Sequence, residues 1–325
     1  MNILILSCGT RSLLVDYFMD RENGFDKVVV TDCSSYSPAL YRADKYYLVP
    51  RINDVNYIPI ILEICDKEEI NAVLPLQEDE LVLISNHRRD FISKGILPII
   101  SSSKSVSLCR DKSLFADEME KKGIITVPTY TVDLVNELIS RYYFPIFMKP
   151  RFGAGSVSSY IIKEENALLF CLKNDDMEFI FQPYLQGREY GVNAYVDIIS
   201  GKLVELFIMN KIRMRSGETE KSISLHNEKI KSIVEKIIAN LSLIGPIDID
   251  IIEKDGVYYV LEINPRFGGG YPHTHECGVN FIKLLSNNLM KKENKPFDME
   301  YEDDIVAFRY MTISTMRRRS MPNEK

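Results

Sequence analysis

The first hundred residues alternate short apolar runs with longer stretches in which apolar and polar residues are mixed. The short runs predict strands, whereas apolar positions that recur every three or four residues in the longer stretches predict helices. This alternation favours a parallel sheet covered by helices on both faces. The predicted strands are 3–6, 27–30, 72–74 and 96–99, and the predicted helices are 12–19, 57–65 and 78–91.

The pattern changes after this region. Ser101–Ser105 is a serine-rich linker or helix start, and a helix over 111–122 is closed by Gly123. Further along, two apolar strands flank Asp255-Gly256, a pair of residues typical of a tight hairpin. The remaining predictions are a strand starting at Val127, strands over 143–150, 247–253 and 257–263, and a helix over 228–241.

Composition narrows the class of protein. The 325 residues carry a net charge of −6, with 46% hydrophobic and 26% charged residues, as expected for a folded chain of two or three lobes. This charge excludes a global basic surface for nucleic acid or an anionic membrane. No apolar run reaches the roughly 20 residues that span a bilayer, and the N-terminus lacks the basic segment of a signal peptide, so we expect a cytoplasmic protein.

The six cysteines are scattered without a C-x-x-C pair, which disfavours a disulfide framework or a zinc knuckle. At the N-terminus, the small-residue turn Ser7–Thr10 and Asp32 are placed as in a dinucleotide-binding unit. The G-x-G-x-x-G pattern is missing, however, so a bound pyrophosphate is not expected there. We therefore expect this lobe to be structural or to contact substrate.

Oxygen-bearing side chains follow both strands of the predicted hairpin. Asp248 and Asp250 alternate with isoleucines and share one face, and Glu262 and Asn264 share a face of the partner strand. Such hard ligands suit Mg²⁺, which takes one or two carboxylates and completes its shell with water and phosphate oxygens. The alternative is a solvated sheet face, which the apolar surroundings of Glu262 and Asn264 disfavour.

Two weaker signals precede the hairpin. Lys149 ends a strand and leads into the glycine-containing loop 153–156, which can surround phosphates but is also compatible with a plain tight turn. The segment 181–190 predicts a strand, a sharp connector at Pro183 and a second strand. It can present backbone groups to a purine, with Glu189 accepting ribose hydroxyls, or serve only as a hinge.

In this order along the chain, these features resemble the ATP-grasp superfamily, most closely a single ATP-grasp unit of the carbamoyl phosphate synthase large-subunit type. The E-I-N-P-R strand end after the hairpin is the most specific part. The motifs that carry the resemblance are D-K-S-L-F at 111–115, F-M-K-P at 147–150, Q-P-Y-L at 182–185, E-Y-G-V-N at 189–193, I-D-I-D at 247–250 and L-E-I-N-P-R at 261–266.

The resemblance implies a fold of the α/β and α+β classes. A Rossmann-like pre-ATP-grasp lobe over 1–103 would precede a two-lobed ATP-grasp domain over 104–325. Within the second domain, the resemblance implies a mobile lid over about 113–186 and a magnesium-binding, catalytic part over about 187–316.

The resemblance also implies roles for single residues. Lysines would contact the nucleotide phosphates, the glycine loop would close over them, and the hinge would meet adenine and ribose. The implied ATP contacts are Lys112, Lys149, Gly153, Ala154, Gly155, Ser156, Gln182, Tyr184, Leu185 and Glu189. The implied ligands of Mg²⁺, with Mn²⁺ as an alternative ion, are Asp250, Glu262 and Asn264.

Arginines complete the implied catalytic set with Lys149. Arg266 would steady an acyl-phosphate, or alternatively form only a salt bridge with Glu262. Arg213 and Arg215 alternate along a predicted strand and could bind a substrate carboxylate, with a solvated charged strand as the alternative. The expected pocket also includes 77–80 and the loop 268–275, where His273 and His275 are expected to be structural or to line substrate.

As the resemblance implies, the activity would be ATP-dependent joining of a small carboxylate or amino acid to an amine of an amino acid, peptide or amino sugar. The alternatives are a carboxylase-type enzyme acting on bicarbonate or carbamate and a nucleotide-binding module without catalysis. The length holds one ATP-grasp unit, not the two of a complete carbamoyl phosphate synthase. We expect small-molecule partners, no nucleic acid and no membrane, with a homodimer left open.

Overall fold

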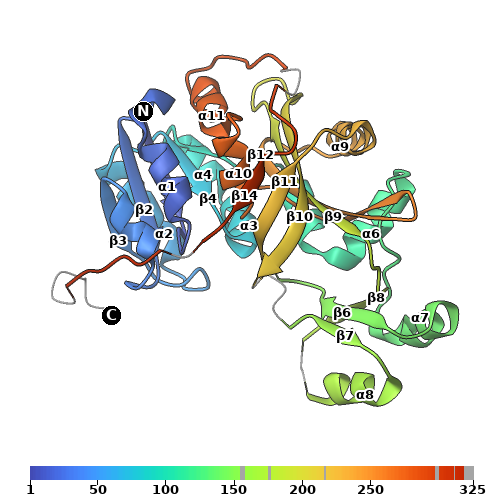
Figure 1. The fold of residues 1–325 in the computed structure, drawn as a ribbon. Helices are drawn as coiled ribbons and strands as arrows, with labels where there is room; N and C mark the ends of the chain where they lie inside the picture. The colour runs from blue at the N-terminus through green and yellow to red at the C-terminus, as the bar shows by residue number, and fades with distance from the viewer. Residues whose placement is uncertain (154–157, 175–176, 216, 297–299, 311, 318–325) are drawn as a thin grey trace.

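The computed structural model describes residues 1–153, 158–174, 177–215, 217–296, 300–310 and 312–317. Its N-terminal part is a parallel five-stranded sheet in the order β3-β2-β1-β4-β5 (Figure 1). The strands are β1 (Asn2–Leu6), β2 (Lys27–Asp32), β3 (Lys45–Leu48), β4 (Ala72–Pro75) and β5 (Leu97–Pro98). The helices are α1 (Ser12–Met19), α2 (Tyr57–Lys67), α3 (Glu78–Asn86) and α4 (Arg88–Ser93), with 3₁₀ turns η1 (Arg21–Asn23) and η2 (Pro38–Arg42).

Both faces of this sheet are buried, as the alternation of strands and helices predicts. Ile3 and Ile5 belong to a core with α1 on one face, whereas Leu4 and Leu6 belong to a core with α2 and α3 on the other. The helix predicted over 78–91 is interrupted at His87 and forms two helices. The edge strand β3 is not among the predictions, because its sequence K-Y-Y-L lacks a continuous apolar run.

The central part is an antiparallel six-stranded sheet in the order β13-β12-β9-β10-β11-β14. The hairpin predicted around Asp255-Gly256 joins its strands β12 and β13, and the predicted amphipathic helix is α9 (Glu228–Asn240), which packs on one face. The strands are β9 (Arg188–Val196), β10 (Leu203–Arg215), β11 (Glu218–Ser224), β12 (Gly245–Lys254), β13 (Val257–Asn264) and β14 (Val306–Phe308).

A third sheet, in the order β7-β6-β8, lies apart from the first at the lower right of Figure 1. Its core is separate, with Leu138 and Leu168 from its two helices. Its elements are η3 (Val132–Leu134), α7 (Val135–Tyr142), β6 (Ile146–Pro150), β7 (Tyr160–Ile162), α8 (Glu165–Asn174) and β8 (Phe179–Pro183). The strand predicted from Val127 is wrong: this segment makes only isolated bridges, from Thr126 and Tyr130.

Helices α5 (Ser103–Arg110) and α6 (Lys112–Lys121) lie along the chain between the first and the third sheet. Helices α10 (Tyr271–Glu276) and α11 (Phe281–Leu289) lie between β13 and β14 of the central sheet. One hydrophobic cluster runs from Phe18 of the N-terminal part through Phe281 to Tyr195 and Phe207 of the central sheet. In contrast, Phe115 and Met119 of α6 pack into the other core of the central sheet. The first part of the predicted lid therefore packs with the central sheet, and the domain boundaries stay predictions.

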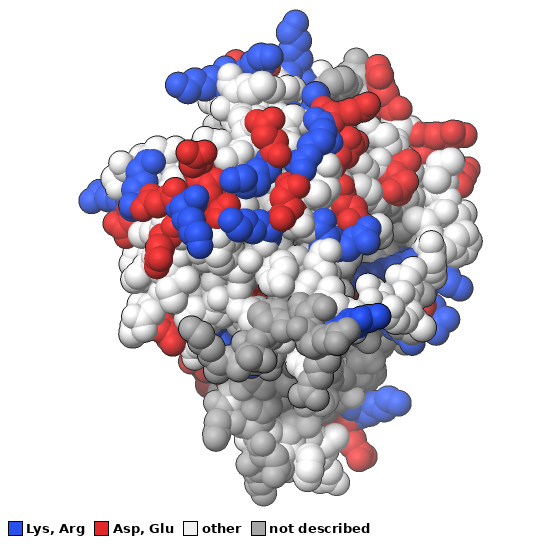
Figure 2. Space-filling view, turned by 90° about the vertical axis from the view of Figure 1, so that its left-hand side faces the viewer, with Lys and Arg blue, Asp and Glu red and all other residues white. Residues whose placement is uncertain are grey.

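The surface and the helices bear on the expected partners. On the face that Figure 2 shows, the described Lys and Arg side chains are interspersed with Asp and Glu. This mixture differs from the one-sided basic surface that a nucleic-acid partner would need. Among the described residues, every helix is too short or too polar to reach across a lipid bilayer.

Candidate active site

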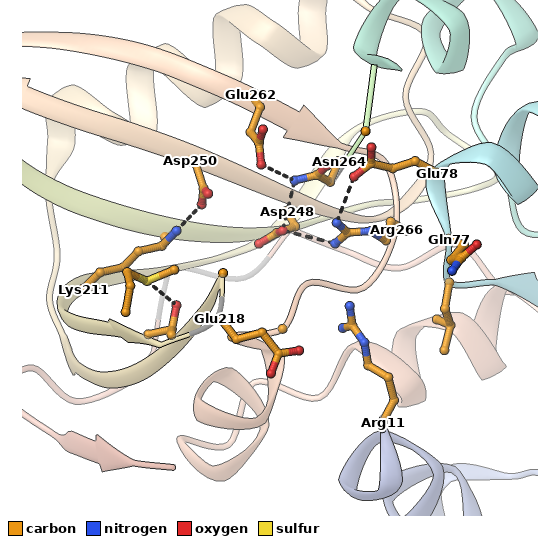
Figure 3. A pocket seen from close by; sticks show the side chains of 18 of the residues that line it. Arg11, Gln77, Glu78, Lys211, Glu218, Asp248, Asp250, Glu262, Asn264 and Arg266 are labelled. Carbon is orange, nitrogen blue, oxygen red and sulfur yellow. Dashed lines mark hydrogen bonds and ion pairs between the residues drawn. The ribbon is translucent and has the colours of Figure 1, made fainter. Parts of the chain in front are cut away.

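A cavity of about 400 Å³ lies where the N-terminal part meets the central sheet (Figure 3). One wall comes from the loops after β1 and β4, including Arg11 and Glu78. The opposite wall comes from the β12–β13 hairpin, and the floor from β9, β10 and the glycines that follow β13. The predicted contributions of 77–80 and of the loop after Arg266 are therefore found in the lining, through Gln77, Glu78, Gly269 and Gly270.

The acidic residues of the hairpin form one row on the cavity. Asp248 pairs with Asn264 and Asp250 pairs with Glu262 across the two strands, so strand alternation places all four on the same face. The Asn264 amide nitrogen donates to Asp248 Oδ2 at 3.3 Å and to Glu262 Oε1 at 3.4 Å. This arrangement leaves the Asn264 amide oxygen as an acceptor beside two carboxylates.

Arg266 lies at the end of this row that faces the N-terminal part of the molecule. Its guanidinium lies 3.2 Å from Asp248 Oδ2 and 3.3 Å from Glu78 Oε1, and it donates to the Phe267 carbonyl at 3.0 Å. Although burial opposes it, these two carboxylates raise the pKa of Arg266 above its usual value. The ion pairs of Arg266 are thus with Asp248 and Glu78, and the alternative of a pair with Glu262 is not what the structure places there.

Lys211 on β10 forms the other end of the row, and the sequence analysis did not single it out. Its ammonium lies 2.5 Å from Asp250 Oδ1. Gly191 lies between them on β9, and a Cβ there would meet Lys211 Cε at 3.0 Å, so glycine gives the lysine its path to Asp250. Burial raises the pKa of Asp250 to about 6, since the Lys211 charge offsets only part of the lost hydration.

Two lysines lie next to the acidic row. Lys149 on β6 is only 8% exposed and has no ion pair among the described residues, and burial lowers its pKa to about 8. Lys112 starts α6 and donates to the Gly153 carbonyl at 2.5 Å. Burial opposes the ionisation of Glu262, but the charges of Lys149 and Lys112 lower its pKa below the usual value. Neither lysine is among the residues that line the cavity, but both charges favour the ionised form of Glu262, which does line it.

The local structure explains why Lys112 and Lys149 come together. Asp111 caps α6 by accepting hydrogen bonds from the Ser113 and Leu114 amides. The same carboxylate binds the Arg151 guanidinium at 2.7 Å, and the Lys112 amide donates to the Arg151 carbonyl at 3.2 Å. The start of α6 is thus tied to the end of β6.

The predicted adenine and ribose contacts lie at the end of β8 (Gln182), on the connector that follows (Tyr184 and Leu185) and at the start of β9 (Glu189). Gln182 is buried and donates to Thr129 Oγ1 at 2.8 Å, and the Tyr184 amide donates to the Pro145 carbonyl at 3.4 Å. Leu185 and Glu189 are half-buried. These four residues are not part of the cavity lining, and the calls Ala154, Gly155 and Ser156 lie outside the described residues, whereas Gly153 lines the cavity.

Arg213 and Arg215 are not brought to the cavity. Both are more than half exposed and pair with Glu220 on β11, at 2.8 and 3.3 Å. The pairing of β10 with β11 shifts between Lys211 and Arg213 and again before Met214, so simple alternation does not extend past Lys211. Lys211 and Met214 line the cavity instead, and the placement of the two arginines favours the alternative of a solvated charged strand.

The two histidines of the H-x-H pattern contact protein groups. His273 is buried, with Nδ1 2.8 Å from Ser222 Oγ and Nε2 3.1 Å from the Ile305 carbonyl. His275 stacks on Tyr17 with ring centroids 3.8 Å apart. Both contacts agree with the structural role that the sequence analysis allowed for them.

The donors in the acidic row fit a magnesium-type ion that has further ligands from a nucleotide. Among the described residues, no three side chains of the His, Cys, Asp and Glu types are grouped to hold a metal by themselves. Asp250, Glu262 and Asn264 supply two carboxylates and one amide oxygen. Since Mg²⁺ usually keeps waters and phosphate oxygens in its shell, this set suffices when phosphates complete it.

Known proteins resemble the chain in both parts. A family described as "PylC-like, N-terminal domain" matches residues 3–100, and a family described as "ATP-grasp domain" matches residues 109–270. Residues 101–108, which include most of α5, lie between the two matches, and the second match includes the whole acidic row and Arg266.

Curated relatives have low identity to the chain. The carbamoyl phosphate synthase large chain of Clostridium perfringens is 24% identical over 330 residues, which cover 93% of this chain and 29% of the relative. The D-alanine–D-alanine ligase of Petrotoga mobilis is 28% identical over 237 residues, or 66% of this chain and 78% of the relative. The chain thus spans less than a third of the length of the synthase chains that it matches.

Solved structures share the fold. The N5-carboxyaminoimidazole synthetase of Staphylococcus aureus, complexed with ADP, has a TM-score of 0.74 at 17% identity and covers 91% of this chain and 78% of its own. The L-amino acid ligase of Bacillus licheniformis has a TM-score of 0.72 at 20% identity, with coverages of 93% and 77%. The expected fold class, a Rossmann-like lobe before a two-lobed unit, is confirmed.

Proposed function

Because the chain belongs to the ATP-grasp superfamily, we propose that it is an ATP-dependent ligase that joins a carboxylate to an amine through an acyl-phosphate. The observation that carries this proposal is an acidic row that lines one cavity and ends in Arg266, together with the buried Lys149, which has no ion pair among the described residues and whose charge acts on Glu262. A triphosphate and a developing acyl-phosphate require carboxylates that bind a metal ion and cationic side chains that neutralise the phosphate charge.

In this proposal, Lys112 and Lys149 bind the nucleotide phosphates, and the loop of Gly153, Ala154, Gly155 and Ser156 covers them. Gln182, Tyr184 and Leu185 contact adenine, and Glu189 binds the ribose. Asp250, Glu262 and Asn264 would hold Mg²⁺, which supplies neutralisation of phosphate charge. For Asp250 to serve as a ligand, its 2.5 Å contact with Lys211 must lengthen or be shared.

The chemistry needs no protein nucleophile. An oxygen of the substrate carboxylate attacks the γ-phosphorus, the bond to the β-phosphate oxygen breaks, and ADP leaves. The amine nitrogen then attacks the carbonyl carbon, the bond from that carbon to the phosphate oxygen breaks, and the amine proton passes to solvent. Arg266 is held by Asp248 and Glu78, so its guanidinium is positioned before substrate arrives.

The substrate is a small carboxylate or amino acid, and the acceptor is an amine. The similarity to an L-amino acid ligase and to a D-alanine–D-alanine ligase supports this pairing. The similarity of fold to the biotin carboxylase domain of the Hydrogenobacter thermophilus 2-oxoglutarate carboxylase, solved with MgADP and bicarbonate, supports a second candidate, in which bicarbonate is the carboxylate that is phosphorylated.

Hydroxylamine trapping tests the proposal. The protein is incubated with Mg²⁺-ATP, hydroxylamine and each of the twenty amino acids or a set of small carboxylic acids, and both ADP and hydroxamate are measured. We expect ADP and hydroxamate to form together with at least one carboxylate. ADP release that needs only bicarbonate would favour the carboxylase-type candidate, and no ADP release with any of them would contradict both.

A further inference from the structure

Arg11 lies at a point of the N-terminal sheet where ligands are often bound. It follows β1, and the strand order places β1 beside β4. From β1 the chain continues to β2 on one side of this pair, and from β4 it continues to β5 on the other side. In open parallel sheets, the crevice at the carboxyl ends of such neighbouring strands is a preferred binding place. The loops after β1 and β4 both line the cavity here, through Arg11 and Gln77–Asp79.

The loop that carries Arg11 is fixed by its own hydrogen bonds. The Gly9 amide donates to Asp32 Oδ2 at 2.8 Å, and the Arg11 amide donates to the Cys8 carbonyl at 2.9 Å. The side chain is half-buried and extends from the start of α1 into the cavity, as Figure 3 shows. Arg11 is therefore held in place before any ligand arrives.

The charges around Arg11 leave it without an ion pair among the described residues. Among the described residues, its guanidinium donates one hydrogen bond, from Nη1 to the Phe267 carbonyl at 3.3 Å. The neighbouring carboxylates have other cations: Asp248 and Glu78 bind Arg266, and Glu218 binds Arg309. Most of the five donors of this guanidinium therefore have no partner among the described residues.

Its surroundings favour an anion as the missing partner. Burial and the nearby charge of Arg266 lower the pKa of Arg11 to about 10, so it stays protonated at neutral pH but is less stable as a cation than in water. A half-buried cation without a partner is unfavourable, and the planar fork of arginine matches a carboxylate in a two-bond geometry.

We infer that Arg11 binds the carboxylate of the amine substrate, so that the acceptor is an amino acid and not a simple amine. This rests on the proposed ligase function. The carboxylate to be phosphorylated must lie near Glu262 and Lys149, and Figure 3 shows Arg11 on the wall opposite Glu262. A carboxylate held at Arg11 is also kept away from the phosphates, and the acceptor therefore escapes phosphorylation.

Two reactions of the same enzyme separate this role from others. With hydroxylamine as acceptor, the reaction depends on the donor carboxylate and ATP but has no acceptor carboxylate. With amino acids as acceptors, each compared with its α-amide, the reaction reports the contribution of that carboxylate. The variants are Arg11→Ala, Arg11→Gln and Arg11→Lys, with Arg51→Ala as the matched control because Arg51 is an exposed arginine outside the cavity.

We expect Arg11→Ala and Arg11→Gln to form hydroxamate within about twofold of the unchanged protein. With the amino acid acceptor, kcat/KM should fall about 10- to 100-fold, mainly through KM, as loss of a charge-assisted contact predicts. The preference for the free acid over the α-amide should disappear, and Arg11→Lys should restore part of it. Arg51→Ala should behave as the unchanged protein.

Three results would overturn the inference. An unchanged KM for the amino acid acceptor in both variants would place its carboxylate elsewhere. An equal loss of hydroxamate formation, in variants that keep the thermal midpoint of the unchanged protein, would assign Arg11 to the donor or the nucleotide. If the unchanged protein forms no hydroxamate with any carboxylate, the proposed function itself fails and this inference with it, which distinguishes that case from the first two.

Discussion

Two acidic side chains that lose hydration on folding have opposite surroundings in this protein. Glu80, on α3, is fully buried and accepts hydrogen bonds from the Ser7 and Tyr57 hydroxyls, while its second oxygen has no hydrogen-bond partner among the described residues. Burial raises its pKa to about 7. Glu262 is only half-buried, and the charges of Lys149 and Lys112 oppose its loss of hydration and lower its pKa.

The difference teaches that burial by itself does not mark a functional carboxylate. Around Glu80 the partners are two neutral hydroxyls and no cation, so the raised pKa of this carboxyl favours its protonated, uncharged form in the packed N-terminal part. Cations around Glu262 keep a charged form available in a partly desolvated cavity, which is what a metal ligand needs. Six substitutions test this comparison.

The largest effect is expected from changes at Glu262 and Arg266. Glu262→Gln keeps the volume but removes the charge, and Arg266→Ala removes the guanidinium beside Asp248. Because both act on phosphate charge in the transition state, ADP formation should fall about 1,000-fold or more in each variant while the fold is retained. Coupled measurement of ADP release and circular dichroism checks this.

Glu80→Gln is the matched control, since it makes the same chemical change at the carboxylate that has no cationic neighbour. It should keep ADP formation near that of the unchanged protein. Turnover that survives in Glu262→Gln, or is lost equally in both variants, would contradict the distinction between the two sites.

A smaller loss is expected from Gly268→Ala. A Cβ at this position would lie 2.3 Å from Asp248 Oδ1 and 2.4 Å from its Cγ, so Asp248 must move away from Arg266 and Asn264. A shift of this size in a positioning group reduces kcat/KM by about 10- to 100-fold. Steady-state kinetics should show this loss, whereas Gly269→Ala, whose Cβ meets Glu218 at an ordinary 3.7 Å, should lose much less.

Glu80→Gln should also change stability with pH. A carboxyl group whose pKa is higher in the folded protein than in the unfolded chain destabilises the fold as pH rises from about 4.5 toward 7. The loss amounts to at most about 3 kcal/mol above that range. The variant should therefore match the unchanged protein near pH 4.5 and have a thermal midpoint about 5 °C higher at pH 8. Equal midpoints at pH 8 would mean that Glu80 is charged without penalty.

The smallest effect is expected at Arg213. It is 62% exposed and pairs with Glu220, and ion pairs on the surface contribute at most about 1 kcal/mol. Arg213→Ala should leave ADP formation and KM within about twofold. A loss of tenfold or more in kcat/KM would instead restore the carboxylate-binding role that its sequence position suggests.

The sequence predicts the elements whose residues are close along the chain. Alternation with period two places Asp248 and Asp250 on one face of β12, and Glu262 and Asn264 on one face of β13. The capped start of α6 is equally local, since Asp111 binds the Ser113 and Leu114 amides. These features need no knowledge of the rest of the fold. The shift in pairing between Asp250 and Ile251, which brings both pairs of residues to the same face of the sheet, is not predictable from alternation.

Contacts between distant segments are not predictable in the same way. Arg11 meets a carbonyl 256 residues away, and Glu78 meets Arg266 from 188 residues away. The pairing of β10 with β11 shifts after Lys211, so the residues that follow do not alternate between the two faces as the sequence suggests. For this reason Lys211 lines the cavity and Arg213 does not. The glycine at 191 opposite Lys211 is the one local signal for this contact.

The hydrophobic cluster shared by the N-terminal part and the central sheet has a consequence for engineering and for evolution. Phe18, Phe267 and Tyr271 pack together across the two parts, with ring centroids 6.0 and 4.7 Å apart for the two pairs that include Phe267. Exchange of the N-terminal part between relatives would break this core unless its partners changed too. The three-stranded sheet, which has a core of its own, is the segment that recombination can replace as a cassette.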